Sequence, residues 1–167
     1  MLRRPPALLF ALALTLGAAC GPPPQAAAQA KAAPAFDIPD LAGGRATLSS
    51  LKGKVVVLDF WATWCGPCLV ELPHYNDFSR QYRPRGVEVV GVVFDSGDPQ
   101  EIQDFVREHR VEYRQLLGND EMMEAFGGNM GLPTTFVIDR DGMIRTKFVG
   151  STPDKFERLH EAVEAVL

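Results

Sequence analysis

The stretch Val55–Cys68, VVVLDFWATWCGPC, decides how this chain folds. Its first seven residues are β-branched, aliphatic or aromatic apart from Asp59, a pattern that predicts a buried strand. The residues after Cys68, over 69–78, predict a helix. The two cysteines are therefore expected at a strand-to-helix turn, at the N-terminus of the helix. Pro67 suits the first helical turn, because its missing N–H costs no hydrogen bond there.

A cysteine at a helix N-terminus is favoured in its thiolate form, since the unpaired backbone N–H groups and the helix dipole stabilise negative charge. We expect Cys65 to be the exposed member of the pair. Its pKa should fall from the ordinary value of about 8.5 toward neutrality, which makes it a nucleophile toward disulfides. Cys68 lies one helical turn later, where it can attack a mixed disulfide on Cys65 and release the product.

Two cysteines at this spacing can also be half of a zinc site. Structural zinc takes four ligands, commonly a second cysteine pair or paired histidines. The third cysteine, Cys20, lies far upstream, and the three histidines are scattered singly at positions 74, 109 and 160. The spacing therefore favours redox chemistry, and we expect no metal and no other cofactor.

The first 34 residues have the composition of an export signal followed by a linker. Residues 1–20 join a short basic start to an apolar run and end in Gly17-Ala18-Ala19-Cys20, as an export signal does. This ending resembles a bacterial lipoprotein signal in which Cys20 is lipidated, although Gly17 stands where leucine is usual. Ordinary cleavage near residues 26–30, an uncleaved anchor and a chance cysteine remain alternatives. Residues 21–34, rich in proline and alanine, predict a flexible tether.

The charge balance argues against one class of partner. The chain has 17 basic and 21 acidic residues, a net charge of −4, and losing Arg3 and Arg4 with a signal leaves −6. Nothing in the sequence resembles the basic patch that nucleic-acid binding requires. Two cysteines in one pair, within an exported domain, indicate chemistry rather than a structural disulfide framework.

Residues 35–167 are enough for one domain with a good core. Gly43-Gly44 predicts the turn of an N-terminal β-hairpin, and Asp98-Pro99-Gln100-Glu101 is typical of a helix start. The remaining pattern predicts a strand over 87–94, an edge strand or link over 111–117, a helix over 121–126, strands over 132–138 and 143–149, and a helix from 152. This order predicts an α/β fold with a mixed central sheet, helices on both faces and the hairpin as an extension.

Three separated pieces resemble the thioredoxin family: Trp64-Cys65-Gly66-Pro67-Cys68, Pro73 in the following helix, and Leu132-Pro133-Thr134. The N-terminal hairpin, the run over 60–65 and the long segment over 96–129 are more similar to the TlpA/ResA branch. The resemblance covers the chain from about residue 36. It implies a thioredoxin fold and a membrane-tethered, extracytoplasmic thiol-disulfide oxidoreductase.

The resemblance also implies roles for individual residues. Cys65 is the attacking thiol and Cys68 the resolving thiol, and Pro133 matches a cis-proline that faces the disulfide. The alternative for Pro133 is an ordinary proline that opens a strand. We expect a client protein to lie against the residues around the disulfide, namely Trp64, Gly66, Pro67, Leu132 and Pro133.

Two acidic residues compete for proton transfer. Asp59 occupies the buried-acid position of thioredoxin, where an apolar strand should raise its pKa and suit it to shuttle a proton for Cys68. Many TlpA-branch proteins carry asparagine there, so the chain departs toward thioredoxin. Glu71 matches a glutamate that ResA-like proteins keep near the active site; its alternative is a solvated first-turn glutamate favoured by the helix dipole. The sequence leaves open which acid takes the proton.

By this resemblance the chain is a reductant of client disulfides, and we expect a monomer, although the sequence leaves a dimer open. Apocytochrome c is the implied client class, and a membrane thiol-disulfide transporter is the implied electron donor. Gly66-Pro67 is the dipeptide of reducing thioredoxins, though a dipeptide alone does not fix a potential. The alternatives are an oxidant that inserts disulfides, a thiol peroxidase, and a binding module whose cysteines are incidental. The Pro…Thr-x-x-Cys setting of a peroxidatic cysteine is absent.

Overall fold

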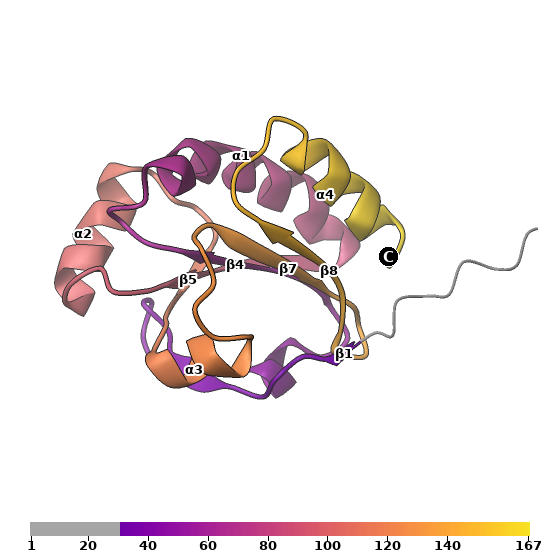
Figure 1. Ribbon diagram of the computed structural model, residues 1–167, viewed down its shortest axis with the longest axis horizontal. Coiled ribbons are helices and arrows are strands. Elements are labelled where there is room, and N and C mark those ends of the chain that lie inside the picture. The colour runs from indigo at the N-terminus through magenta and orange to yellow at the C-terminus, as the bar shows by residue number, and fades with distance from the viewer. Residues whose placement is uncertain (1–30) are drawn as a thin grey trace, which may run out of the picture.

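The computed structural model describes residues 31–167, and its centre is a six-stranded sheet (Figure 1). The strands are β1 (Lys31–Ala32), β2 (Asp37–Pro39), β3 (Arg45–Thr47), β4 (Val55–Trp61), β5 (Val87–Val93), β6 (Arg114–Leu117), β7 (Thr134–Ile138) and β8 (Met143–Val149). The helices are α1 (Gly66–Tyr82), α2 (Pro99–Glu108), α3 (Asp120–Ala125) and α4 (Lys155–Glu164), with short 3₁₀ turns at Leu48–Leu51 and Arg83–Arg85.

The large sheet has the order β1-β8-β7-β4-β5-β6. β4 runs parallel to β5 and antiparallel to β7, and β5 runs parallel to β6. The predicted mixed sheet is therefore confirmed. The other predicted helices and strands are also present, with their ends shifted by a few residues.

β4 is the central strand, and all seven of its residues are buried. Side chains of a strand alternate between its two faces. Three of them pack with α1 and α4 (Val55, Val57 and Trp61), and three pack with α3 and the N-terminal hairpin (Val56, Leu58 and Phe60). Figure 1 shows α1 and α4 over one face of the sheet and α3 over the other. By this alternation Asp59 belongs to the face that α1 and α4 cover.

The N-terminal hairpin is confirmed and has a place in the core. β2 and β3 pair antiparallel across a turn in which Gly43 and Gly44 have φ values of +105° and +81°, a conformation that glycine adopts readily. Ile38 and Ala46 of the two strands are buried against the sheet. The hairpin therefore closes the face opposite α1.

The start of the folded unit differs from the prediction. Residues 31–34 were predicted to end the tether, but β1 pairs antiparallel with β8, and the backbone N–H of Ala33 donates to the carbonyl of Gly142 at 2.9 Å. The outer edge of β8 has free backbone groups, which a short extended segment of small residues can pair without needing apolar side chains. The predicted signal, Cys20 and the rest of the tether lie outside the described residues. Within 31–167, no helix is both long enough and apolar enough to cross a bilayer.

Candidate active site

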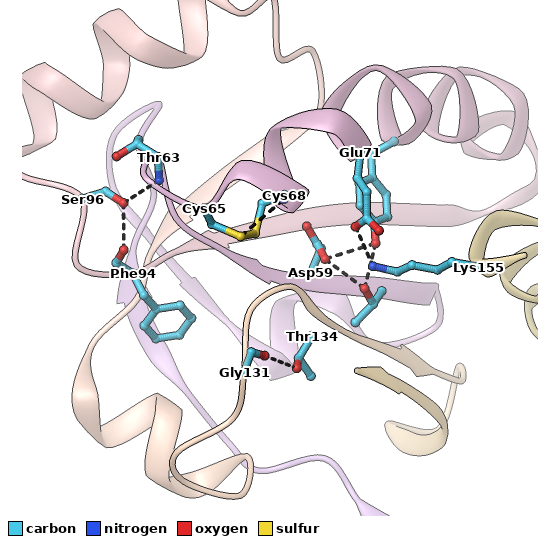
Figure 2. The surroundings of a disulfide bond; sticks show 12 residues. Asp59, Thr63, Cys65, Cys68, Glu71, Phe94, Ser96, Gly131, Thr134 and Lys155 are labelled. Atoms are coloured by element: carbon cyan, nitrogen blue, oxygen red, sulfur yellow. Dashed lines mark hydrogen bonds and ion pairs between the residues drawn. A yellow bond between two sulfur atoms is a disulfide. The ribbon is translucent and has the colours of Figure 1, made fainter. Parts of the chain in front are cut away.

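The two cysteines lie where the sequence predicted them, between β4 and α1 (Figure 2). Cys65 and Cys68 form a disulfide, with Cα atoms 5.2 Å apart. Cys65 is the N-cap of α1, and its Sγ accepts a hydrogen bond from the backbone N–H of Cys68 at 3.3 Å. Pro67 stands in the first turn, as expected. The structure therefore describes the oxidised state of the pair.

The expected exposure of Cys65 is wrong. The residue is only 5% exposed, because its sulfur is bonded to Cys68 and packs with the apolar core beneath α1. The neighbouring Trp64 is 64% exposed instead. In the oxidised state, Trp64 is therefore far more accessible to solvent than Cys65.

Two hydrogen bonds hold the turn before the cysteines against the loop after β5, and a third fixes Ser96 within that loop. The backbone N–H of Thr63 donates to Ser96 Oγ at 2.9 Å, and Ser96 Oγ donates to the carbonyl of Phe94 at 2.7 Å (Figure 2). Trp64 Nε1 donates to the carbonyl of Asp95 at 2.8 Å. These bonds fix the position from which Cys65 enters α1.

The residues expected to hold a client are divided between a pocket, the start of the helix and the interior. Trp64 and Leu132 line one pocket of about 780 Å³ between the cysteine turn and α3. Gly66 and Pro67 are exposed at the start of α1, whereas Pro133 is buried. The peptide bond between Leu132 and Pro133 is cis, as the resemblance implied. Figure 2 draws the turn that contains it in the surroundings of the disulfide.

Asp59 is a buried acid, 2% exposed, on the α1 side of β4. Its Oδ1 accepts hydrogen bonds from the Tyr75 hydroxyl at 3.1 Å and the Thr135 hydroxyl at 2.9 Å. Burial raises the pKa of Asp59 from 3.8 to about 7; Lys155 lowers it and Glu71 raises it by charge, and the two hydroxyls lower it. A group with this pKa exchanges protons at neutral pH.

Glu71 is also buried, so its alternative as a solvated first-turn residue is wrong. It is 3% exposed, and its Oε2 accepts a hydrogen bond from Lys155 Nζ at 2.6 Å. Lys155 lies at the start of α4 and is 1% exposed. The ion pair joins α1 to α4 beside Asp59 (Figure 2).

Lys155 was not predicted as a site residue, although the sequence carries a signal for it. Lys155, Leu159 and Val163 are four residues apart and form the buried face of α4. This spacing places the lysine on the same side of the helix as the apolar residues. A cation on such a face requires a buried anion as partner, and Glu71 is that anion.

Comparison with known proteins gives consistent matches to thiol-disulfide enzymes. The model of the AhpC/TSA family matches residues 30–147, which include both cysteines of the site. Thiol-disulfide oxidoreductase ResA from Bacillus anthracis is 35% identical over 120 residues, covering 72% of this chain and 69% of that protein. ResA from Geobacillus kaustophilus is 34% identical over 143 residues, covering 83% of this chain and 80% of that protein.

A solved structure of similar fold agrees with these relatives. The crystal structure of a putative thiol:disulfide interchange protein DsbE from Chlorobium tepidum superposes with a TM-score of 0.76 at 33% identity. The match covers 82% of this chain and 96% of that one. The chain therefore belongs to the AhpC/TSA family, in which it is a thiol-disulfide oxidoreductase of the ResA/TlpA-like type with a thioredoxin fold.

Proposed function

We propose that this chain is an exported, membrane-associated reductant of disulfides in client proteins. The observation that carries the proposal is the arrangement of the Cys65–Cys68 disulfide at the N-terminus of α1 with a buried acid, Asp59, whose pKa is raised to about 7. The cysteine pair supplies a nucleophile, and Asp59 supplies a group that accepts and returns a proton.

The first step is attack by the Cys65 thiolate on one sulfur of the client disulfide. A bond forms between Cys65 Sγ and that sulfur, the client's S–S bond breaks, and the second client sulfur leaves as a thiolate that takes a proton from solvent. Cys65 suits this step because it caps α1, where the free N–H groups stabilise its negative charge. In the oxidised structure the Cys68 N–H already donates a hydrogen bond to Cys65 Sγ, the direction that would stabilise a thiolate at Cys65.

The second step is attack by Cys68 on the mixed disulfide. The Asp59 carboxylate accepts the proton of the Cys68 thiol, Cys68 Sγ bonds to Cys65 Sγ, and the remaining client sulfur leaves with the bonding electron pair. Two electrons have then passed to the client, and the chain has the disulfide seen in the structure. Asp59 suits this role better than Glu71, because Glu71 is already engaged by the ammonium of Lys155.

The client class proposed is apocytochrome c, whose two haem-binding cysteines must be reduced. The family resemblance supports this choice, together with the Gly66-Pro67 dipeptide. A membrane thiol-disulfide transporter would return the electrons. The test is reduction of an oxidised peptide with the haem-binding motif by the reduced chain, with Cys65 and Cys68 replaced in turn. Failure of the unaltered chain to reduce the peptide would reject this client class.

The proposed attachment to the membrane is through lipidated Cys20, which follows three small residues. We expect the full chain to fractionate with membranes in a bacterial host. A lipidated cysteine that carries more than one acyl chain binds a bilayer stably. A Cys20→Ala variant should appear in the soluble extracytoplasmic fraction. Equal membrane association of both forms would show that another part of the first 30 residues is the anchor.

A further inference from the structure

Lys155 and Glu71 form an ion pair in the interior, and neither group is accounted for by the two chemical steps. Lys155 Nζ lies 2.6 Å from Glu71 Oε2 and 5.6 Å from the centre of the Tyr75 ring, with 1% of the lysine exposed. Removing two charges from water is costly, and close pairing offsets that cost only in part. An apolar pair of similar volume would serve the stability of the fold as well or better.

The environment of the pair is incompletely satisfied. Within residues 31–167, Glu71 Oε1 and the Tyr113 hydroxyl are buried without a hydrogen-bond partner. A pair retained only for packing would be expected to have all its polar atoms bonded. The location of the pair, between α1 and α4 and next to Asp59, points instead to an electrostatic role (Figure 2).

We propose that Lys155 is a positioning residue, which with Glu71 sets the balance of charge against which Asp59 exchanges its proton. The inference rests on the proposed role of Asp59 as proton acceptor for Cys68. The ammonium of Lys155 favours the Asp59 carboxylate, and the carboxylate of Glu71 favours the protonated acid. Because the two charges have opposite signs and lie side by side, their effects on the ionisation of Asp59 oppose each other.

The surroundings of Asp59 are consistent with this balance. Titratable or polar groups lie near it on four parts of this side: Glu71 and Tyr75 on α1, Thr135 on β7, Lys155 on α4, and Tyr113 before β6. The buried residues that α2 and β8 add to the same core, Ile102 and Phe148, are apolar. The hydroxyl groups of Tyr75 and Thr135 are neutral hydrogen-bond donors to the carboxylate. The two charged groups acting on Asp59 are Lys155, which lowers its pKa, and Glu71, which raises it.

This balance has a chemical consequence. A group that accepts a proton in one direction of exchange and returns it in the other works best with a pKa near the operating pH. With both partners present, burial and charge leave the pKa of Asp59 at about 7. Loss of either partner alone should move it away from neutrality, in opposite directions.

The experiment is a double-mutant cycle in the full chain, with the oxidised protein titrated by ¹³C NMR of the Asp59 carboxyl carbon. We expect Lys155→Met to raise the midpoint by about one pH unit or more, since an unpaired Glu71 charge then opposes ionisation of Asp59. Glu71→Gln should lower it by a similar amount, because Lys155 is then free to attract the Asp59 carboxylate. The double variant should return to within about half a pH unit of the unaltered chain.

A matched control uses the ion pair of Lys54 with Glu88, which joins the residue before β4 to β5 at the surface with a separation of 2.5 Å. Lys54→Met and Glu88→Gln should leave the Asp59 midpoint unchanged. Midpoints that shift in the same direction in both Lys155→Met and Glu71→Gln, or that do not move, overturn the proposal. If Lys155→Met does not fold, the double variant is compared with Glu71→Gln. The proposal requires a higher Asp59 midpoint in the double variant, and equal midpoints in the two would overturn it.

A second readout separates this inference from the proposed function. The pH midpoint of the resolving step, measured as release of a mixed disulfide from Cys65, should shift in parallel with the NMR midpoint in each variant. Shifted NMR midpoints with an unchanged kinetic midpoint would leave the charge balance established and reject Asp59 as the proton acceptor. Unchanged NMR midpoints, with kinetics that still require Asp59, would reject the role of Lys155 alone.

Discussion

Replacing Cys65 with serine is expected to abolish reduction of client disulfides, with a loss of at least about 10⁴-fold. A hydroxyl at the N-cap of α1 keeps the hydrogen bond that the Cys68 N–H now donates to sulfur. It cannot form the mixed disulfide through which exchange proceeds. The fold should be retained, so the loss is chemical. The measurement is the rate at which the reduced protein reduces a disulfide-containing peptide.

Cys68→Ser provides the matched control, because the same atom is changed in the other cysteine. This variant keeps the nucleophile and lacks the resolving thiol, so it should form a mixed disulfide with the client and stop. Mass spectrometry would detect one client molecule per chain, joined to Cys65. The proposed order of attack is contradicted if the adduct forms on Cys68 in Cys65→Ser and not on Cys65 in Cys68→Ser.

Asp59→Asn is expected to slow the resolving step by about 10²-fold at pH 7, which is at the low end of what general bases contribute. Asparagine has nearly the same shape and can still accept hydrogen bonds from Tyr75 and Thr135. It cannot take the proton of Cys68. The rate should therefore lose its dependence on a group that titrates near pH 7.

The same substitution should stabilise the oxidised protein at alkaline pH. Burial raises the pKa of Asp59 in the folded state to about 7, against an ordinary value of 3.8. The folded state therefore binds the proton more tightly, and its stability falls as pH rises from about 4 to about 7. A difference of about three pH units, at about 1.4 kcal/mol each, corresponds to a penalty of about 4 kcal/mol above pH 7.

In Asp59→Asn this penalty is absent. Urea unfolding at pH 8 should show a free energy of unfolding higher by a few kcal/mol, whereas at pH 4 the two forms should be similar. The variant is expected to be slower but more stable, because a buried acid that serves activity lowers the stability of the fold. Equal loss of stability at both pH values would mean that Asp59 is ionised in the fold throughout.

The unit formed by β4 and α1 could be predicted because its signals are local. A run of buried β-branched residues, a proline suited to the first helical turn and a cysteine at the cap position all lie within Val55–Cys68. β1 could not be predicted in this way. Two residues pair with β8 through their backbones, and their side chains are exposed, so no apolar pattern marks them.

The site was predicted where chemistry depends on spacing and missed where it depends on contacts between distant elements. The positions of Cys65 and Cys68 follow from the sequence, but the burial of Cys65 depends on how its sulfur turns in the disulfide. Lys155 stands 84 residues after Glu71. Only the packing of α4 against α1 brings the two charges together, and lysine near a helix start is usually solvated.

The reduction potential of the Cys65/Cys68 pair decides whether the chain donates electrons to client disulfides or takes them from client thiols. It is measured on the full chain with Cys20→Ala, so that a single cysteine pair titrates in glutathione or dithiothreitol buffers. A reductant of client disulfides should have a potential of about −250 mV or lower, close to that of thioredoxin. A potential near about −120 mV would contradict the account and make the chain a donor of disulfides.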